Sequence, residues 1–336
     1  MGYFCLVSEE TVPTHLVQRP LLNANRQGLD LGALLRSARI PDDVAYTPRA
    51  RVTLNQLSGL TRSIWAETDD DLFGVGPNLP LGSFRLVAPR IFSAPDLRSM
   101  LIRMDQATRV LTATPRIEAL LDDDTPRLTV DVHRLDDPEH IVIDTLIAFI
   151  HRTIGWAIGR RVPLVFLEMP YETSPFLRYY EAAFGLLPTF GAEVAVLGFD
   201  TDLLDAPLLR TPADLDAYVA ESPTNFFSIR DHGSRTADQV RRLLEQGLTG
   251  DWPTPDEIAA RLSVSVHHLR RLLREEDTTV SDLRRDLMRD TAINSLVIGK
   301  ESIDDLSARL GFSEPSAFRR AFRRWTGMPP GAYRPR

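Results

Sequence analysis

Apolar residues follow a regular helical spacing throughout the last hundred residues of the chain. They recur every three or four positions in short blocks, and polar or small residues separate the blocks. This spacing places the apolar side chains of each block on one face of a helix, so it predicts a region made only of helices. The expected helices cover 238–247, 256–262, 266–275, 280–297, a block that starts after Ser302, and 314–325.

One helix-turn-helix pattern occurs twice in this region, at 254–275 and at 302–325. In each copy an apolar-striped helix ends at a short turn, and a second helix that carries paired arginines follows. Two such units, one after the other, are typical of a protein that reads two neighbouring segments of a DNA groove.

Capping residues mark the expected ends of these helices. Polar residues at expected helix starts are Thr254 with Glu257, Ser265, Ser281, Ser302 with Asp305, and Ser313. The two pairs have the spacing of capping boxes. Gly299 follows the long central helix, and Ser263 and Gly311 occupy the turns of the two units.

The preceding part of the chain has a mixed pattern and no repeat. Helices are expected at 29–38, 52–66, 95–112, 141–159 and 174–185, and strands at 127–135, 162–168 and 192–199. The pattern predicts an α+β N-terminal effector or dimerisation domain at 1–220, followed by an all-α domain with two helix-turn-helix units at 237–335. Residues 221–236 mix Pro, Asn, Ser, Gly and charge without periodicity, which predicts a linker.

The net charge of −7 over 336 residues does not by itself suggest a DNA-binding protein. The charge is unevenly divided, however, because residues 237–336 carry +2 and the remainder carries −9. Every basic residue except Lys300 is an arginine, a side chain that forms forked hydrogen bonds to guanine and phosphate. Their clustering on particular helices matters more for DNA contact than the total charge does.

An apolar stretch at 141–159 is the nearest approach to a membrane segment. Asp144, His151 and Arg152 interrupt it, and one charge near a bilayer centre costs about 2.5–3.5 kcal/mol, so a buried core helix is expected. The first residues have no basic leader and no small-residue cleavage pattern. Cys5 is the single cysteine, which fits a reducing compartment. We therefore expect a cytoplasmic, nucleoid-associated protein with no membrane partner.

The helical region resembles the DNA-binding domain of the AraC/XylS family of bacterial transcription regulators. The similarity covers about 237–335, and its densest part is the run from Gly311 to Gly327, followed by Pro329, Pro330, Tyr333 and Arg334. Two departures are Ser307, where the family usually has Ala, and Ser263, where Gly is common. Both substitutions are small enough to be compatible with the same fold.

The N-terminal part resembles the arabinose-binding-type domain of regulators of the ornithine and virulence kind. The residues that carry this more diffuse similarity are Tyr180, Phe184, Gly185, Phe190, Leu197, Gly198, Phe199, Leu203, Pro207 and Leu208. In the family, such domains bind a small effector or mediate self-association.

The resemblance implies that the second helix of each unit, here called the recognition helix, enters the major groove. The residues expected to face DNA are Val266, His267, Arg270, Arg271, Arg274, Glu314, Ser316, Arg319, Arg320, Arg323 and Arg324. The residues expected to face inward are Leu269, Leu272, Leu273, Phe318 and Phe322. We favour Arg270 and Arg319 for contacts to bases, because they follow the apolar row directly, and Arg274, Arg323 and Arg324 for phosphates.

The expected partners are double-stranded promoter or operator DNA, a small-molecule effector, a second copy of the chain and RNA polymerase, with activation as the mode of regulation. Two alternatives stay open. The N-terminal domain could bind a protein and no small molecule, or the chain could be an architectural DNA-binding protein, which its acidic N-terminal part disfavours. The two recognition helices present different side chains, so the DNA site of one subunit is expected to be asymmetric.

The sequence predicts no catalytic site, metal site or cofactor. Cys5 has no nearby histidine, and His267 and His268 are adjacent, so they point in different directions on a helix. The residues that bind an effector are not identified. Two groups have a structural alternative: the aromatic residues Phe176, Tyr179, Tyr180, Phe184 and Phe190 could line a pocket or, as we favour, pack the core, and the acidic loop around His133 and His140 is expected to be exposed.

Overall fold

The structure, a computed structural model, describes residues 10–122, 124–227, 236–248, 252–276 and 278–335. The chain forms two compact units that do not follow the order of the sequence. The first unit contains Met1–Gln18, Gly32–Gly59 and Gly233–Arg336, and the second contains Arg19–Leu31 and Leu60–His232. The boundaries of this division within the described residues fall inside three helices, α1 (His15–Arg26), α2 (Leu31–Ser37) and α4 (Leu54–Thr68).

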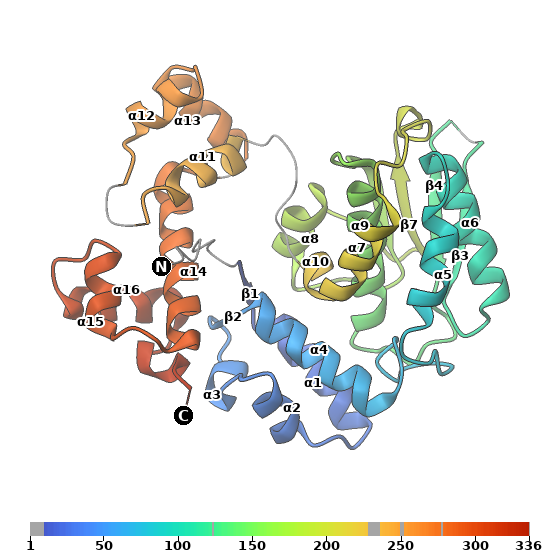
Figure 1. Ribbon diagram of the computed structural model, residues 1–336, viewed down its shortest axis with the longest axis horizontal. Coiled ribbons are helices and arrows are strands. Elements are labelled where there is room, and N and C mark those ends of the chain that lie inside the picture. The colour runs from blue at the N-terminus through green and yellow to red at the C-terminus, as the bar shows by residue number, and fades with distance from the viewer. Residues whose placement is uncertain (1–9, 123, 228–235, 249–251, 277, 336) are drawn as a thin grey trace. The chain divides into compact units, whose positions relative to one another are not determined.

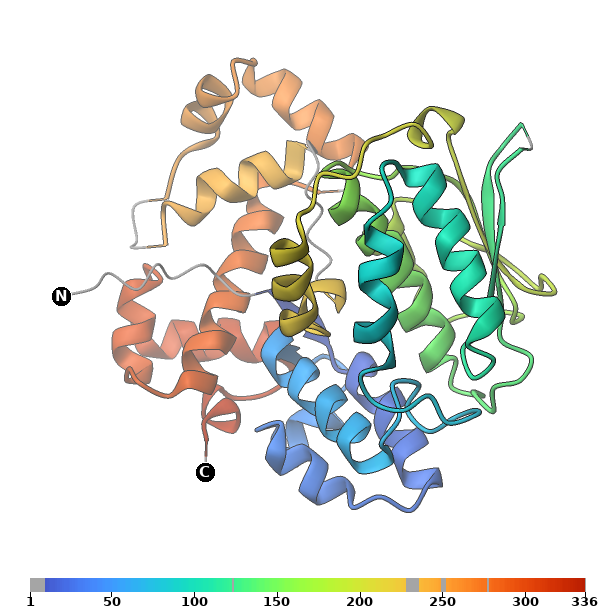
Figure 2. The same cartoon turned by 45° about the vertical axis from the view of Figure 1, so that its right-hand side comes forward.

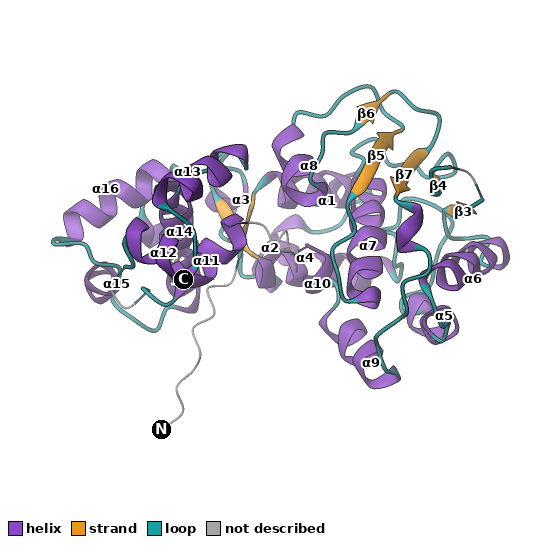
Figure 3. Ribbon diagram, turned by 90° about the horizontal axis from the view of Figure 1, so that it is seen from above, coloured by secondary structure: helices purple, strands orange, loops and turns teal. Residues whose placement is uncertain are grey.

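The second unit is built around a five-stranded sheet of order β3-β4-β7-β5-β6 (Figure 3). Its strands are β3 (Arg116–Leu120), β4 (Arg127–Asp131), β5 (Leu164–Met169), β6 (Thr189–Phe190) and β7 (Ala195–Phe199). All neighbouring pairs are antiparallel except β5 and β6, which are parallel. All residues of β7, the middle strand, are buried.

Helices complete the core of the second unit around this sheet. They are α5 (Ser83–Phe92), α6 (Leu97–Val110), α7 (Ile141–Ile158), α8 (Leu177–Phe184), α9 (Pro212–Glu221) and α10 (Thr224–Phe227), with a 3-10 turn η1 (Thr201–Leu203). Helices α5 and α6 lie side by side (Figure 2). Helix α7 is long and apolar enough to cross a membrane, but 61% of it is buried inside the protein. The expected buried helix is confirmed.

The first unit contains the helices of the C-terminal region. They are α11 (Thr236–Glu245), α12 (Pro255–Arg261), α13 (Val266–Glu275), α14 (Val280–Ile298), α15 (Ile303–Arg309) and α16 (Pro315–Thr326), followed by the 3-10 turn η2 (Pro330–Tyr333). Helix α14 runs from the α11–α13 group to the α15–α16 group (Figure 1). The expected fold class, an α+β N-terminal part followed by a helical region, is therefore confirmed.

N-terminal elements complete the first unit. They are β1 (Thr11–Pro13), α2 (Leu31–Ser37), α3 (Asp42–Ala45) and β2 (Arg51–Thr53), and β1 pairs with β2 in antiparallel register. Both strands contact α14. The domain boundary expected near residue 220 did not anticipate that residues 11–18 and 32–59 pack with the C-terminal helices. Within the expected linker, residues 224–227 form α10, while Cys5 and residues 228–235 lie outside the described residues.

Two expected caps were wrong. Ser313 does not cap the second recognition helix, because α16 begins at Pro315 with Glu314 at the capping position and no side-chain cap. Pro315 supplies a fixed backbone angle and has no N–H to satisfy. Helix α14 is capped by Thr279, which accepts a hydrogen bond from the N–H of Asp282, and not by Ser281. The expected roles of Gly299 and Gly311 are confirmed, since both adopt the left-handed conformation that glycine favours.

Candidate nucleic-acid interface

The first helix-turn-helix unit consists of α12 and α13, and capping interactions define the starts of both helices. Thr254 and Glu257 form the expected capping box, with Pro255 in the first turn. Hydrogen bonds from the Thr254 N–H and hydroxyl lower the pKa of Glu257. Ser265 accepts a hydrogen bond from the N–H of His268 at 3.1 Å, so the start of the recognition helix α13 lies where the sequence predicted.

The second helix-turn-helix unit consists of α15 and the recognition helix α16. Ser302 caps α15 by accepting the N–H of Asp305 at 3.0 Å. Four aromatic side chains then surround the inner face of α16. Phe318 and Phe322 are fully buried, and the ring of Phe322 meets that of Tyr333 edge to face at 5.3 Å. Phe312 packs against Phe318 with the ring centroids 5.5 Å apart. These contacts leave the arginine-bearing face of α16 exposed.

The core of the first helix-turn-helix unit, to which α11 and α14 also contribute, is aliphatic. Its buried members are Val240, Leu244, Leu248, Ile258, Ala259, Leu269, Leu273 and Leu287. Leu269 and Leu273 face inward from α13, and Leu272 is half-buried. Val266, which we expected to face DNA, is also half-buried and packs against this core. Part of the Val266 side chain therefore contributes to the core, whereas His267, Arg270, Arg271 and Arg274 are exposed.

The candidate DNA-facing residues of α16 form one exposed surface. Glu314, Ser316, Arg319, Arg320, Arg323 and Arg324 are all exposed. Two of these form a local contact, in which the Ser316 hydroxyl donates to Glu314 Oε2 at 3.1 Å. Among the described residues, no acidic side chain forms an ion pair with Arg320, Arg323 or Arg324. Their guanidinium groups are therefore available to an anionic partner.

The two recognition helices differ in the neighbours of their equivalent arginines. Arg319 donates from Nη2 to Asp304 Oδ1 on α15 at 3.0 Å, in a pair whose members are 52% and 66% exposed. Arg270 has no such partner among the described residues, whereas Arg271 interacts with His268 and lies 3.8 Å from Glu275. An exposed ion pair contributes only about 0–1 kcal/mol, so a phosphate or base can displace Asp304 from Arg319.

Trp252, which precedes α12, also packs against the core of the first helix-turn-helix unit. The guanidinium of Arg284 on α14 lies 4.7 Å from the centre of its ring, and its Nε1 lies close to Gly311 in the turn of the second helix-turn-helix unit. A residue outside both patterns thus lies between elements of both units.

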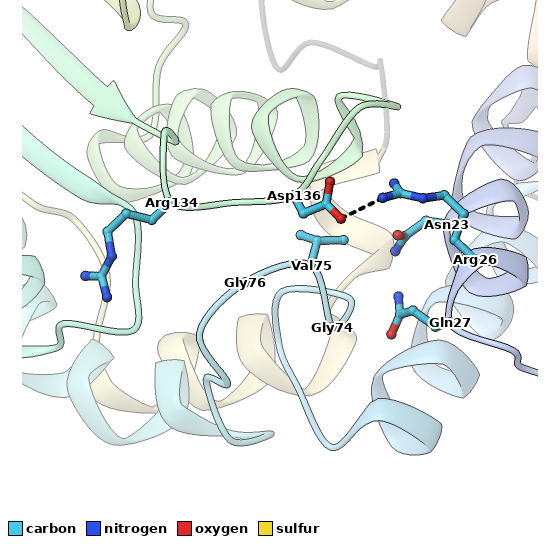
Figure 4. Close-up of a pocket in the computed structure, with 8 residues that line it drawn as sticks. All are labelled: Asn23, Arg26, Gln27, Gly74, Val75, Gly76, Arg134 and Asp136. Atoms are coloured by element: carbon cyan, nitrogen blue, oxygen red, sulfur yellow. Dashed lines mark hydrogen bonds and ion pairs between the residues drawn. The ribbon is translucent and has the colours of Figure 1, made fainter.

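A pocket with a volume of about 410 Å³ lies in the second compact unit (Figure 4). It is lined by Asn23, Arg26, Gln27, Gly74, Val75, Gly76, Arg134 and Asp136. Arg26 Nη2 pairs with Asp136 Oδ2 at 2.6 Å, while Arg134 extends away from Asp136 and donates to the Thr112 carbonyl. The side-chain amides of Asn23 and Gln27 both donate to the Phe73 carbonyl, which fixes the adjoining loop against α1.

This pocket was not predicted from the sequence, although a signal was present. Asn23, Arg26 and Gln27 are spaced by three and four residues, so they share one face of a helix. The helix itself was not predicted, because Pro20 interrupts its pattern.

The aromatic group on and around α8 packs the core, as we favoured. Tyr180 and Phe184 are buried, and Phe176, Tyr179 and Phe190 pack against the same cluster. Asp144 of α7 accepts hydrogen bonds from the hydroxyls of Tyr171 and Tyr180 and pairs with Arg19 at 2.7 Å. Burial and the carboxylate of Asp144 raise the pKa of both tyrosines, which therefore remain neutral donors.

The acidic loop before α7 is less exposed than expected. The side chain of Asp137 accepts hydrogen bonds from the N–H groups of Ile141 and Val142, each at 2.8 Å, and so caps α7. The ring of His140 stacks on that of Tyr171, with centroids 4.1 Å apart. These side chains stabilise the helix start.

Comparison with known proteins agrees with both parts of the fold. The model of the arabinose-binding domain of AraC transcription regulators matches residues 28–208, and that of a helix-turn-helix domain matches 258–336. The ornithine utilization regulator of Pseudomonas aeruginosa is 26% identical, over 97% of this chain and 96% of its own. The virulence regulon transcriptional activator VirF of Shigella flexneri is 30% identical, over 28% of this chain and 36% of its own.

The solved structure of the transcriptional regulator CdpR from Pseudomonas aeruginosa aligns with 95% of this chain and 97% of its own, at 21% identity and a TM-score of 0.31. That score is too low to add to the argument. The family match spans more than half of the chain, and the helix-turn-helix match covers both recognition helices. The chain therefore belongs to the AraC family of DNA-binding transcription regulators, in the group with an arabinose-binding-type N-terminal domain.

Proposed function

We propose that α13 and α16 enter consecutive major-groove segments of one operator, about 34 Å apart. The observation that carries this proposal is the pair of helices whose apolar sides are buried and whose outer faces bear arginines. Helix α14 has 19 residues and is therefore about 28 Å long, which is of the right order to separate two such helices.

In this arrangement Arg270 and Arg319 contact base edges, and Arg274, Arg323 and Arg324 contact phosphates. The other exposed candidates, His267, Arg271, Glu314, Ser316 and Arg320, contribute to the fit around them. Val266 also belongs to the proposed interface: it is half-buried against the core, and the exposed part of its side chain faces the groove. Since the first helix presents Val266 and His267 where the second presents Glu314 and Ser316, each helix reads different bases.

Arg319→Ala tests this placement. The duplex for the assay is first selected from a random DNA library by the wild-type full-length chain. A bidentate arginine–guanine contact is worth about 1–3 kcal/mol, so the variant should bind this duplex roughly 5- to 150-fold more weakly. Arg285→Ala is the matched control, because Arg285 is an exposed arginine of α14 already paired with Asp282. Unaltered binding by Arg319→Ala would refute the placement of α16.

We further propose that the N-terminal domain responds to a small-molecule effector that binds in the 410 Å³ pocket. The opposite charges of Arg26 and Asp136, with the amides of Asn23 and Gln27, suit a small zwitterion that carries both a carboxylate and an ammonium group. The relative named for ornithine utilization makes amino acids the first class to test.

A thermal-shift screen of the full chain with amino acids, sugars and fatty acids tests the effector proposal. Amino acids should raise the melting temperature, and Arg26→Ala should abolish the shift, while Arg98→Ala, a change in another ion pair of the same unit, should preserve it. If no class stabilises the chain, the alternative that this domain binds a protein partner is favoured.

The remaining assignments complete the proposal. We propose that residues 1–220 respond to the effector, that 221–236 are a linker and that 237–335 bind DNA, with residues 11–18 and 32–59 packed against the DNA-binding helices. We propose that the chain activates transcription as a homodimer in contact with RNA polymerase at the bacterial nucleoid, acts without catalysis, and needs no cofactor or metal. The similarity to a transcriptional activator supports this mode over an architectural role.

A further inference from the structure

A buried carboxylate lies at the middle of the first compact unit. Asp290 belongs to the central helix α14 and is 2% exposed. An ionised carboxylate is strongly disfavoured in the protein interior unless charged and hydrogen-bonding groups compensate it. The groups around Asp290 therefore show which parts of the chain must be in place for this unit to form.

The compensating groups come from three separate segments of the chain. Arg289, also on α14, donates from Nε and Nη2 to Asp290 Oδ1 at 3.1 and 3.0 Å. Arg241 of α11 donates to Oδ2 at 3.0 Å. The N-terminal strands supply the rest, because the hydroxyl of Thr11 donates to Oδ1 at 2.6 Å and Arg51 Nε lies 4.0 Å from the same oxygen.

The charge balance favours an ionised Asp290. Burial is the largest influence on this group and would raise its pKa, but the neighbouring arginines outweigh burial and lower the pKa of Asp290. Three guanidinium groups surround this carboxylate. Among the described residues, Asp286 also pairs with Arg289, and the charge of Glu10 acts on Arg51. Removing any one contact therefore leaves buried charge less well compensated.

The N-terminal strands are also attached to the second helix-turn-helix unit. The backbone N–H of Arg51 donates to the hydroxyl of Tyr333, whose ring packs on Phe322 of α16. The hydroxyl of Thr47 lies 3.4 Å from the sulfur of Met328, just beyond α16. Arg51 also donates from Nε to Thr11 Oγ1 at 2.8 Å, which links the two strands.

The first helix-turn-helix unit is linked to the other oxygen of the same carboxylate through Arg241 of α11. Arg241 lies on α11 next to Val240, and Val240 and Leu244 are fully buried in the core beneath α13. Asp290 thus connects α11, which supports one recognition helix, with the strands that contact the end of the other.

Strands β1 and β2 form a two-stranded antiparallel ribbon. We propose that this β1–β2 ribbon is part of the DNA-binding unit, and that Asp290 and Arg51 are positioning residues. They set the spacing of the two recognition helices. This inference rests on the proposed binding of one operator by both helices. The ribbon touches no DNA in this account. It acts by limiting the geometries that α13 and α16 can adopt relative to each other, so both helices reach their groove segments without further ordering.

The test measures the full-length chain on two DNA duplexes. The full duplex is selected from a random library by the wild-type chain, and the half duplex keeps only the segment protected by α16, with the other segment scrambled. Arg51→Ala should weaken binding to the full duplex by about tenfold or more, because joint binding by two modules depends on their geometry. Binding to the half duplex should change less than about twofold, because α16 and its core are intact.

Three further variants separate positioning from general destabilisation. Arg51→Lys keeps the charge and should restore most of the lost affinity. Arg49→Ala removes an exposed arginine of the same segment and should match the wild type on both duplexes. Thr11→Val keeps the shape of β1 but removes its hydrogen bond to Asp290, so it should follow Arg51→Ala in the same direction even if Arg51→Ala itself does not fold.

In a second assay, one base pair is inserted between the two segments of the full duplex. The wild type should lose affinity sharply, whereas Arg51→Ala and Thr11→Val should be less sensitive to this insertion. Equal losses on the full and half duplexes, or no loss on either, would overturn the inference. If the wild-type chain selects no preferred sequence from the library, the proposed DNA-reading function fails instead, and the two failures are distinguishable.

Discussion

The turns of the two helix-turn-helix units adopt the same backbone conformation with different residues. Ser263 has φ of 57° and Gly311 has φ of 80°, and each lies one position beyond the C-cap of the preceding helix. The backbone N–H groups donate equivalently, from Ser263 to Ala260 at 3.1 Å and from Gly311 to Ala308 at 3.0 Å. The left-handed conformation costs a non-glycine residue about 1–2 kcal/mol. Ser263 in the first helix-turn-helix unit is therefore strained, whereas Gly311 in the second is not.

Two reciprocal substitutions measure this difference. Ser263→Gly removes the strain but adds backbone entropy to the unfolded chain, so it should stabilise the first unit by about 0.5–1 kcal/mol. Gly311→Ala should destabilise the second unit by about 1 kcal/mol. Among the described residues, a new Cβ there would meet Trp252 Nε1 alone, at 3.9 Å, so the effect comes from the backbone rather than from a clash.

Hydrogen exchange read by mass spectrometry resolves the two units within one chain. A change of 1 kcal/mol alters local opening about fivefold, so Ser263→Gly should slow exchange in α12 and α13 by up to this factor. Gly311→Ala should speed exchange in α15 and α16 by about as much. Peptides from the unaltered unit are the internal control. Faster exchange in Ser263→Gly, or no change in Gly311→Ala, would refute the reasoning.

Three further predictions concern single acidic and basic residues. Asp304→Asn should strengthen binding to the selected duplex by a few-fold in a gel-shift titration, because it releases Arg319 and removes a negative charge beside DNA; weaker binding would count against α16 as a recognition helix. Arg324→Ala should reduce the slope of log affinity against log salt by about 1 and weaken all sequences alike, and a change in sequence preference instead would reassign it to base contact. Burial raises the pKa of Asp137 to about 6, so the folded state holds a proton that the unfolded state releases between about pH 4 and 6. The free energy of unfolding therefore falls as pH rises through that range, and urea titrations of Asp137→Asn should lack this part of the slope; an unchanged slope would contradict the shift.

Local patterns in the sequence were sufficient to predict the helical region. Caps such as Thr254 and Ser265 act within three residues of themselves, and the apolar stripe of each helix needs no knowledge of its partner. The failures were also local in origin. Ser313 looked like a cap by analogy with Ser265, but Pro315 shifts the start of α16 by one residue relative to the serine.

The contacts that join distant segments could not be predicted in the same way. Thr11 and Asp290 are 279 residues apart, and neither lies in a pattern that identifies the other. Strands β1 and β2 have three residues each, too few to show the alternation that predicts a strand. Val266 was assigned to the DNA-facing surface because Leu269, Leu272 and Leu273 already accounted for the inward face of the helix. Its burial depends on the core supplied by α11 and α14.

The central claim is that two different helices of one chain read two different segments of DNA. Hydroxyl-radical footprinting of the full chain on its selected duplex, with wild type, Arg270→Ala and Arg319→Ala, tests it most directly. The wild type should protect two patches on one face of the duplex, about one helical turn apart. Each variant should lose a different patch and retain the other. Uniform protection along the duplex, or loss of the same patch in both variants, would contradict the account.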